Sequence, residues 1–147
     1  MNPPVPRVLQ GVAANLLTEV MREIRTPFGQ QLVGIAAVLN LMAAEEFERA
    51  ADRLVEENRI VRKLLADGLA LLGEAAPAGM RDALGAPPAA SLRISDLQRE
   101  NDLLRAGLIE LHAAVEATPG DAARALESRI WDELIESTRR RHFASRP

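Results

Sequence analysis

The chain has 147 residues and a mass of 16.0 kDa, and its 18 basic and 21 acidic residues leave a formal net charge of −3 at pH 7. A chain of this length can bury its own hydrophobic core as one domain. The absence of cysteine excludes disulfides, thiolate metal sites and a cysteine nucleophile. Nucleic-acid-binding domains usually carry a net basic face, so the acidic balance leads us to expect no nucleic-acid partner.

The composition favours an all-α protein. Tyrosine is absent and aromatic residues make up 3% of the chain, whereas β-sandwiches and barrels depend on aromatic and β-branched side chains. Alanine and leucine, which are frequent, are strong helix formers. Lys63 is the only lysine, a preference for arginine that is typical of GC-rich bacterial genes. We predict an all-α bundle of about four helices, one of them long and very apolar, completed by oligomerisation.

The first predicted helix covers residues 7–25 and follows a proline-rich lead at 1–6, which we expect to be flexible. A wide apolar stripe runs along this helix. Thr26 and Pro27 end it, because the residue before a proline is disfavoured in the α-helical region. Thr26 can also cap the helix that follows.

The second predicted helix covers residues 28–72, unless it bends at Gly34 or breaks after Gly68. Residues 32–44 are apolar nearly all round, but a membrane-spanning helix needs about 20 such residues. We therefore interpret this segment as the buried core of a soluble, cytoplasmic protein without a signal peptide or a membrane span. A four-helix monomer has little room for a helix buried on every side, so we predict a homodimer or higher oligomer. The candidate residues of the shared core are Leu32, Ile35, Val38, Leu39 and Met42.

The remaining chain predicts a connection and two further helices within a single domain over 7–142. Proline and glycine residues indicate a loop over 73–94, with at most a short turn near 80–84, that serves as a crossover, a lid or a linker. Ser95 and Gln98 match a capping box that would start a helix over 95–117. Asp121 is the expected N-cap of a last helix over 122–142, before a flexible tail at 143–147.

One internal repeat stands out along the chain. Its two copies share the same order of residue types. They consist of Leu54, Glu57, Asn58, Val61, Arg62 and Leu65, and of Leu97, Glu100, Asn101, Leu104, Arg105 and Leu108. Steps of four and three residues indicate a coiled-coil seam with asparagine at a, glutamate at g and arginine at e, where a buried asparagine fixes the register.

The charges of the repeat favour a parallel pairing of its two copies. In a parallel pair g faces e′, so glutamate meets arginine, whereas in an antiparallel pair glutamate meets glutamate. The long 73–94 connection would permit the parallel arrangement, and Asn58 and Asn101 would then lie close together, within one chain or between two. Each exposed ion pair contributes only about 0.2–1 kcal/mol, so apolar packing can override this pattern, and the repeat can also arise by chance. A third interpretation is a polar ligand pocket, for which the candidate residues are Asn40, Asn58, Asn101, Arg62, Arg105 and His112.

No motif in the sequence identifies a catalytic residue. The chain has neither a Gly-x-Ser-x-Gly nucleophile motif nor a phosphate-binding glycine pattern. His112 and Glu116 have the i,i+4 spacing of two metal ligands on one helix face, but the paired Glu-x-x-His motifs of a di-iron bundle are missing. We interpret this pair as an ordinary helix pair and expect no metal and no cofactor. Trp131 is interpreted as a core or interface aromatic.

The favoured functional hypothesis is therefore a non-catalytic, homo-oligomeric helical protein that acts as an interaction or accessory module. Its expected partner is a second copy of itself, and another protein is the further option. The alternative is a small-molecule-binding or enzymatic bundle with a polar pocket between the helices over 28–72 and 95–117. A peripheral lipid-surface role is a weaker hypothesis, because the polar faces are rich in glutamate and almost free of lysine.

Overall fold

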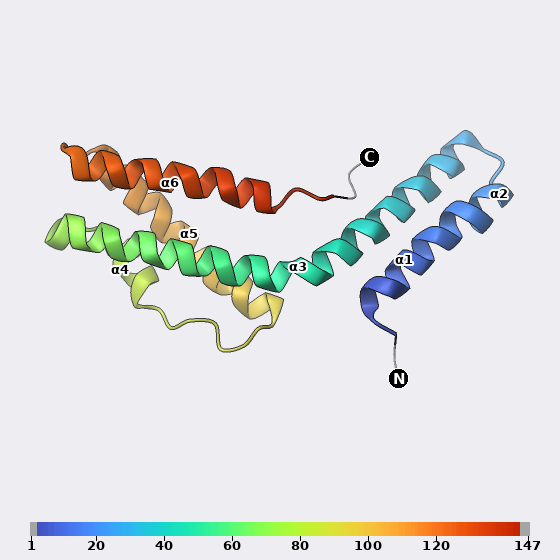
Figure 1. The fold of residues 1–147 in the computed structure, drawn as a ribbon, viewed down its shortest axis with the longest axis horizontal. Coiled ribbons are helices and arrows are strands. Elements are labelled where there is room, and N and C mark those ends of the chain that lie inside the picture. The colour runs from blue at the N-terminus through green and yellow to red at the C-terminus, as the bar shows by residue number, and fades with distance from the viewer. Residues whose placement is uncertain (1–2, 145–147) are drawn as a thin grey trace. The chain divides into compact units, whose positions relative to one another are not determined.

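The computed structural model describes residues 3–144, which form helices and contain no strand (Figure 1). This confirms the predicted all-α class. The contacts group the chain into two compact units, residues 1–50 with 143–147 and residues 51–142. The sequence pattern, which predicts one domain over 7–142, gives no sign of this division. We expect the N-terminal lead (1–6) and the C-terminal tail (143–147) to be flexible. Residues 1–2 and 145–147 of these segments lie outside the described residues.

The predicted helices are present, with shifted ends. They begin with α1 (Val5–Asn15), the π-helical η1 (Leu16–Val20), α2 (Met21–Glu23) and the 46-residue α3 (Pro27–Leu72). The chain continues with the 3₁₀-helical η2 (Gly73–Ala75), α4 (Ala78–Gly85), α5 (Ile94–Glu116) and α6 (Asp121–Arg140). Helix α3 is continuous through Gly34 and Gly68, so the alternative of a break is wrong. The 73–94 connection contains the whole of α4, so its prediction as a loop was only partly correct.

The first unit is a helical hairpin, in which a short turn joins α2 to the start of α3 (Figure 1). Thr26 supports this turn as predicted, because its Oγ1 accepts a hydrogen bond from the Gly29 backbone N–H at 3.2 Å. The buried residues of the hairpin are small: Pro6, Ala13, Ala37, Ala44 and Ala50.

The large apolar side chains of the hairpin remain exposed in the single chain. Leu32, Ile35 and Leu39 are 51%, 48% and 58% exposed, while Val38 and Met42 are half-buried. The fully buried residues of the hairpin are small alanines and a proline rather than these leucines. Burial of residues 32–44 in a core shared between copies stays a prediction. The helical segment that starts at Pro27 is long and apolar enough to cross a membrane by length and composition alone, two properties that it shares with core helices of soluble proteins.

The second unit packs residues 51–72 of α3 with α4, α5 and α6 around one apolar core. Its buried side chains come from every one of these helices and include Leu65, Met80, Leu104, Leu111 and Ile130. Helix α4 packs closely on α5 at Gly107, which has no side chain. A Cβ at this position would lie 2.7 Å from the Ala83 Cβ. The crossover thus supplies core residues as well as a connection.

Two predicted helix caps are wrong. Arg93, not Ser95, is the N-cap residue of α5, and the Gln98 side chain instead donates to Asp102 at 2.7 Å. The start of α5 is stabilised from upstream, because the Ser91 hydroxyl accepts the Arg93 N–H and donates to Asp96. The hydrogen bond from the Ser91 hydroxyl, together with one from Arg99, holds the pKa of Asp96 below its usual range.

The second cap fails for a conformational reason. Gly120 occupies the N-cap position of α6, with φ at +123°, and Asp121 is the first helical residue. Glycine adopts positive φ without steric cost, so the tight turn between α5 and α6 places it there.

We expect Gly107→Ala to destabilise the second unit by about 1–3 kcal/mol, because the new methyl group would lie 2.7 Å from the Ala83 Cβ, which can move only together with the backbone of α4. Thermal unfolding followed by circular dichroism at 222 nm measures the change. Gly85→Ala, at the end of α4, is the control, since a Cβ there has no atom within 4 Å. Equal stabilities of the two variants would contradict the close packing of α4 on α5.

Candidate functional site

Helices α3 and α5 run in the same direction in the second unit. Asn58 of α3 reaches Leu97 and Asn101 of α5, and further along both helices a Cβ at Gly68 would collide with Leu111. The residue numbers of the contacts therefore rise together along both helices (Figure 1). The two copies of the repeat face each other in parallel within one chain, as their charges predict.

The asparagines of the repeat bond to each other in the interior. Asn58 is 4% exposed and Asn101 is 1% exposed. The Asn101 amide donates to the Asn58 Oδ1 at 2.8 Å, and the Asn58 amide donates to the Leu97 carbonyl at 3.1 Å. A slip by one residue would leave these amides without partners, which costs about 1–3 kcal/mol for each buried group. The pair therefore fixes the register of α3 against α5.

Glu57 is the most deeply buried charged residue that the structure describes, with 0% exposure. Its Oε2 accepts hydrogen bonds from Arg141 at 2.7 Å, Arg105 at 3.3 Å and Asn101 at 3.4 Å. Arg53, one turn earlier on α3, lies 4.0 Å from Oε1. Arginines from α3, α5 and the end of α6 thus surround one carboxylate, which compensates its loss of hydration.

The second predicted ion pair of the repeat joins α3 and α5 to the crossover. The Arg62 Nε donates to the Glu100 carboxylate at 2.8 Å. Arg62 also donates to the Leu84 carbonyl, and Glu100 accepts the Ala89 backbone N–H at 2.9 Å. The pair therefore holds the end of α4 and the segment that follows it against α3 and α5.

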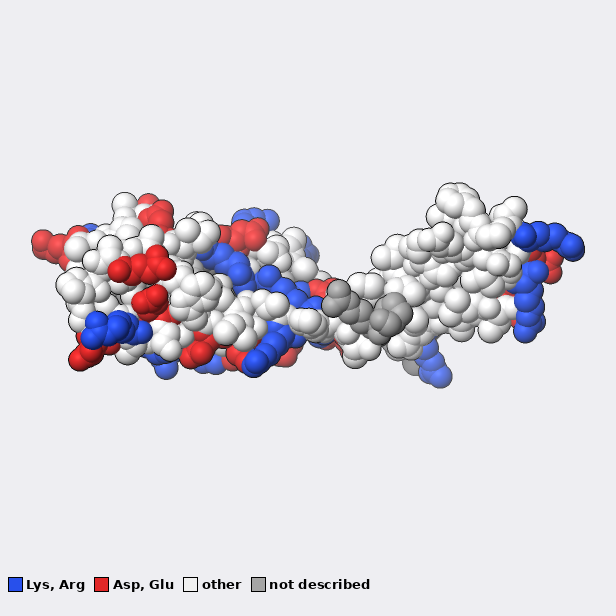
Figure 2. Space-filling view, turned by 90° about the horizontal axis from the view of Figure 1, so that it is seen from above, with Lys and Arg blue, Asp and Glu red and all other residues white. Residues whose placement is uncertain are grey.

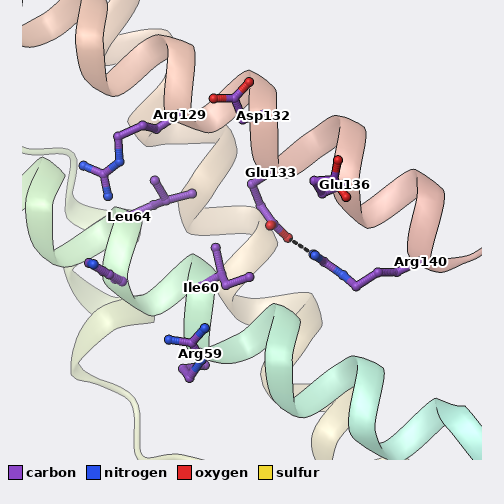
Figure 3. A pocket seen from close by; sticks show the side chains of 9 residues that line it. Arg59, Ile60, Leu64, Arg129, Asp132, Glu133, Glu136 and Arg140 are labelled. Carbon is purple, nitrogen blue, oxygen red and sulfur yellow. Dashed lines mark hydrogen bonds and ion pairs between the residues drawn. The ribbon is translucent and has the colours of Figure 1, made fainter.

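A groove of about 340 Å³ runs between α3 and α6 (Figure 3). Ile60 and Leu64 of α3 contribute apolar side chains, and charged side chains of both helices surround them. Glu133 is 6% exposed and bonds to Arg140, about two turns later on α6. Burial raises the pKa of Glu133 above its usual range, although the bond to Arg140 opposes this shift.

The structure brings together four of the six predicted pocket residues. Asn58, Asn101, Arg62 and Arg105 belong to the α3–α5 pairing just described, and Asn58 and Arg62 also line a surface groove of about 280 Å³ beside residues 88–92. Asn40 belongs to the first unit, where its amide donates to the Ala36 carbonyl of its own helix. His112 lies on a different part of α5, against Trp131.

Sequence reasoning missed the contribution of α6 to this cluster. Glu133 and Ser137 are buried, and Arg141, which the sequence indicates only as a cation at the end of the last helix, bonds to Glu57. The signal is present in the spacing of the buried positions of α6, which is three and four residues throughout. They are Ala123, Leu126, Ile130, Glu133 and Ser137.

Among known proteins, no family model, curated protein or solved structure matches this chain.

We expect Glu57→Gln to lower the free energy of unfolding by about 2–3 kcal/mol, less than the roughly 3–5 kcal/mol of a fully buried pair because the arginines are partly exposed. Urea unfolding measures the loss. The matched control is Glu56→Gln, which removes only the exposed pair with Arg59 and should cost less than about 1 kcal/mol. Similar losses in both variants would contradict the role of Glu57.

We expect Glu133 to make the folded protein less stable as pH rises through its raised pKa, because the folded state then loses a proton that it holds more tightly than the unfolded state. At pH values below the ordinary pKa of glutamate, both states hold the proton, so Glu133 no longer makes stability depend on pH. The difference in urea midpoint between wild type and Glu133→Gln, measured from pH 4 to pH 7, isolates this group. The urea midpoint of the wild type should fall relative to that of Glu133→Gln as pH rises. A rise instead would show that the bond to Arg140 dominates.

Proposed function

We propose that the protein is a non-catalytic, self-associating helical module and that a second copy covers the apolar face of its hairpin. The observation that carries the proposal is the exposure of large apolar side chains in the first unit. They are Val5, Val8, Val12, Leu17, Phe28, Leu32, Ile35, Leu39 and Phe47, with exposures between 44% and 71%. Soluble monomers rarely leave a contiguous surface of this kind uncovered.

The exposed residues of α3 have the spacing of a helix-pairing seam. Phe28, Leu32, Ile35 and Leu39 follow one another by steps of four, three and four residues, and half-buried Met42 continues the pattern. This heptad spacing keeps one stripe of a helix against a partner helix. The seam is therefore suited to a second helix better than to a small molecule.

The charge distribution favours a second copy as the partner. No charged residue occurs between Arg25 and Glu45, and none occurs between Arg7 and Glu19. On the face shown in Figure 2, the hairpin presents a nearly continuous surface without charged side chains except towards its ends. An uncharged apolar face complements an identical face, since no charges of like sign meet, and C₂ dimers use such self-complementary surfaces.

The alternative of an enzyme or ligand-binding bundle has less support from the polar residues. The side chains of Asn58 and Asn101 are hydrogen-bonded to each other, and those of Glu57 and Glu100 are bonded to arginines. These contacts fix helices in register and leave few converging groups for a substrate. In the described part of the chain, the exposed apolar side chains favour a partner surface, whereas the polar side chains of this cluster are already bonded within the protein.

We expect light scattering at micromolar concentration to give the purified protein a mass of at least twice the 16.0 kDa of one chain. Leu39→Glu should weaken the association at least tenfold, which corresponds to about 1.4 kcal/mol, because a charge enters the apolar seam. The control is Ile109→Glu, which changes an even more exposed apolar residue of α5 in the other unit.

A monomeric wild type, or equal dissociation of both variants, would contradict the proposal. Circular dichroism verifies that Leu39→Glu remains helical, and Leu32→Gln provides a milder change in the same seam if it does not. Sedimentation with anionic phospholipid vesicles distinguishes a bilayer as the partner. Co-sedimentation of a monomeric wild type, abolished by Leu39→Glu, would replace the second copy by a membrane surface.

A further inference from the structure

Three side chains with metal-ligating atoms converge where α5 and α6 leave their connecting turn. They are His112 and Glu116, one turn apart on α5, and Glu127 on α6. One ligand atom from each residue lies within 4.8 Å of the other two. The sequence shows only the i,i+4 pair, from which we expect no metal; the fold adds the third side chain from the neighbouring helix.

The imidazole of His112 is held in place but has an unused nitrogen. Its ring packs edge-on against Trp131, with ring centroids 5.1 Å apart and an interplanar angle of 83°. Its Nε2 is buried and has no hydrogen-bond partner among the described residues, while the Glu116 Oε1 lies 3.6 Å away, beyond hydrogen-bonding distance. Buried polar atoms in folded proteins usually have a partner, so this nitrogen has the capacity to bind a further group.

We propose that His112, Glu116 and Glu127 bind a divalent transition metal of the Zn²⁺ class. Imidazole and carboxylate ligands suit Zn²⁺, at about 2.0–2.2 Å from nitrogen and oxygen, and the flexible glutamates can close the remaining distance. A histidine ligand disfavours Mg²⁺ and Ca²⁺, which prefer oxygen ligands alone. Three protein ligands leave a fourth tetrahedral position for water.

The metal would connect α5 to α6 across the turn at 117–120. It would offset the repulsion between two neighbouring carboxylates and give the buried Nε2 a partner. This role is independent of self-association, because all three residues lie in the second unit and the exposed seam of α3 lies in the first.

Trp131 makes the binding measurable, since it is the only tryptophan and the chain has no tyrosine. Untagged, chelator-treated protein is titrated with CoCl₂ while tryptophan fluorescence is recorded. We expect saturable quenching at micromolar Co²⁺, because the paramagnetic ion would lie beside the ring that contacts His112. Addition of ZnSO₄ should reverse the quenching by competition, and Zn²⁺ alone should raise the thermal midpoint.

Variants of the ligands distinguish this site from adventitious binding. Glu127→Gln should weaken Co²⁺ and Zn²⁺ binding about tenfold or more, and His112→Ala should abolish it. His142→Ala is the matched control, because it removes the other histidine and leaves the three ligands intact. Quenching that is absent below millimolar Co²⁺, that is equal in Glu127→Gln and wild type, or that Mg²⁺ reverses as well as Zn²⁺ does, would overturn the proposal. Calorimetry with ZnSO₄ provides the same comparison if His112→Ala alters the fluorescence by itself.

Discussion

A carboxylate that has lost contact with water requires cations and hydrogen-bond donors around it, and Glu57 imposes that requirement on the second unit. Its partners come from α3, α5 and the end of α6, so three separate segments of the chain must be in place together. The neighbouring pair of Asn58 and Asn101 adds a constraint of register, because the Asn101 amide donates to the Asn58 Oδ1 and the Asn58 amide donates to the Leu97 carbonyl. Apolar packing supplies the larger part of the stabilisation, whereas these polar contacts select one alignment of the helices from several that would bury similar area.

The two units solve the problem of burial in opposite ways. In the second unit, leucine, isoleucine and methionine side chains form the core, and the buried residues Glu57, Asn58 and Asn101 hydrogen-bond across helices. In the first unit, small alanines allow the two arms of the hairpin to approach, and the larger side chains face outward. Such an arrangement forgoes much of the roughly 1.5–3 kcal/mol that each large side chain gains when fully buried. A partner surface recovers that free energy, which is why the proposed function places the second copy on the hairpin.

The sequence predicts the helices and the α3–α5 pairing better than it predicts burial or the helix ends. Apolar periodicity and the prolines delimit α3, and the alternation of glutamate and arginine in the repeat predicts the ion pairs of Glu57 with Arg105 and of Glu100 with Arg62. The apolar surface around Leu32 and Leu39 predicts that one chain cannot cover it, and both are exposed in the single chain. The pattern does not predict that alanines fill the interior of the hairpin. The start of α5 depends on Ser91, and the third carboxylate beside His112 comes from a different helix. Both are consequences of tertiary structure that local patterns do not contain.

The parallel pairing of α3 with α5 also has consequences for the order in which contacts form. Asn58 and Asn101 are 43 residues apart, and Glu57 and Arg141 are 84 apart, whereas α5 and α6 are joined by a turn of a few residues. Closing a longer loop costs more chain entropy, so we expect the α5–α6 hairpin to form before α3 docks on it. The carboxylate of Glu57 then stays hydrated until the last segment arrives. Its desolvation therefore falls late in folding, at a stage when the arginines that compensate it are already held in position.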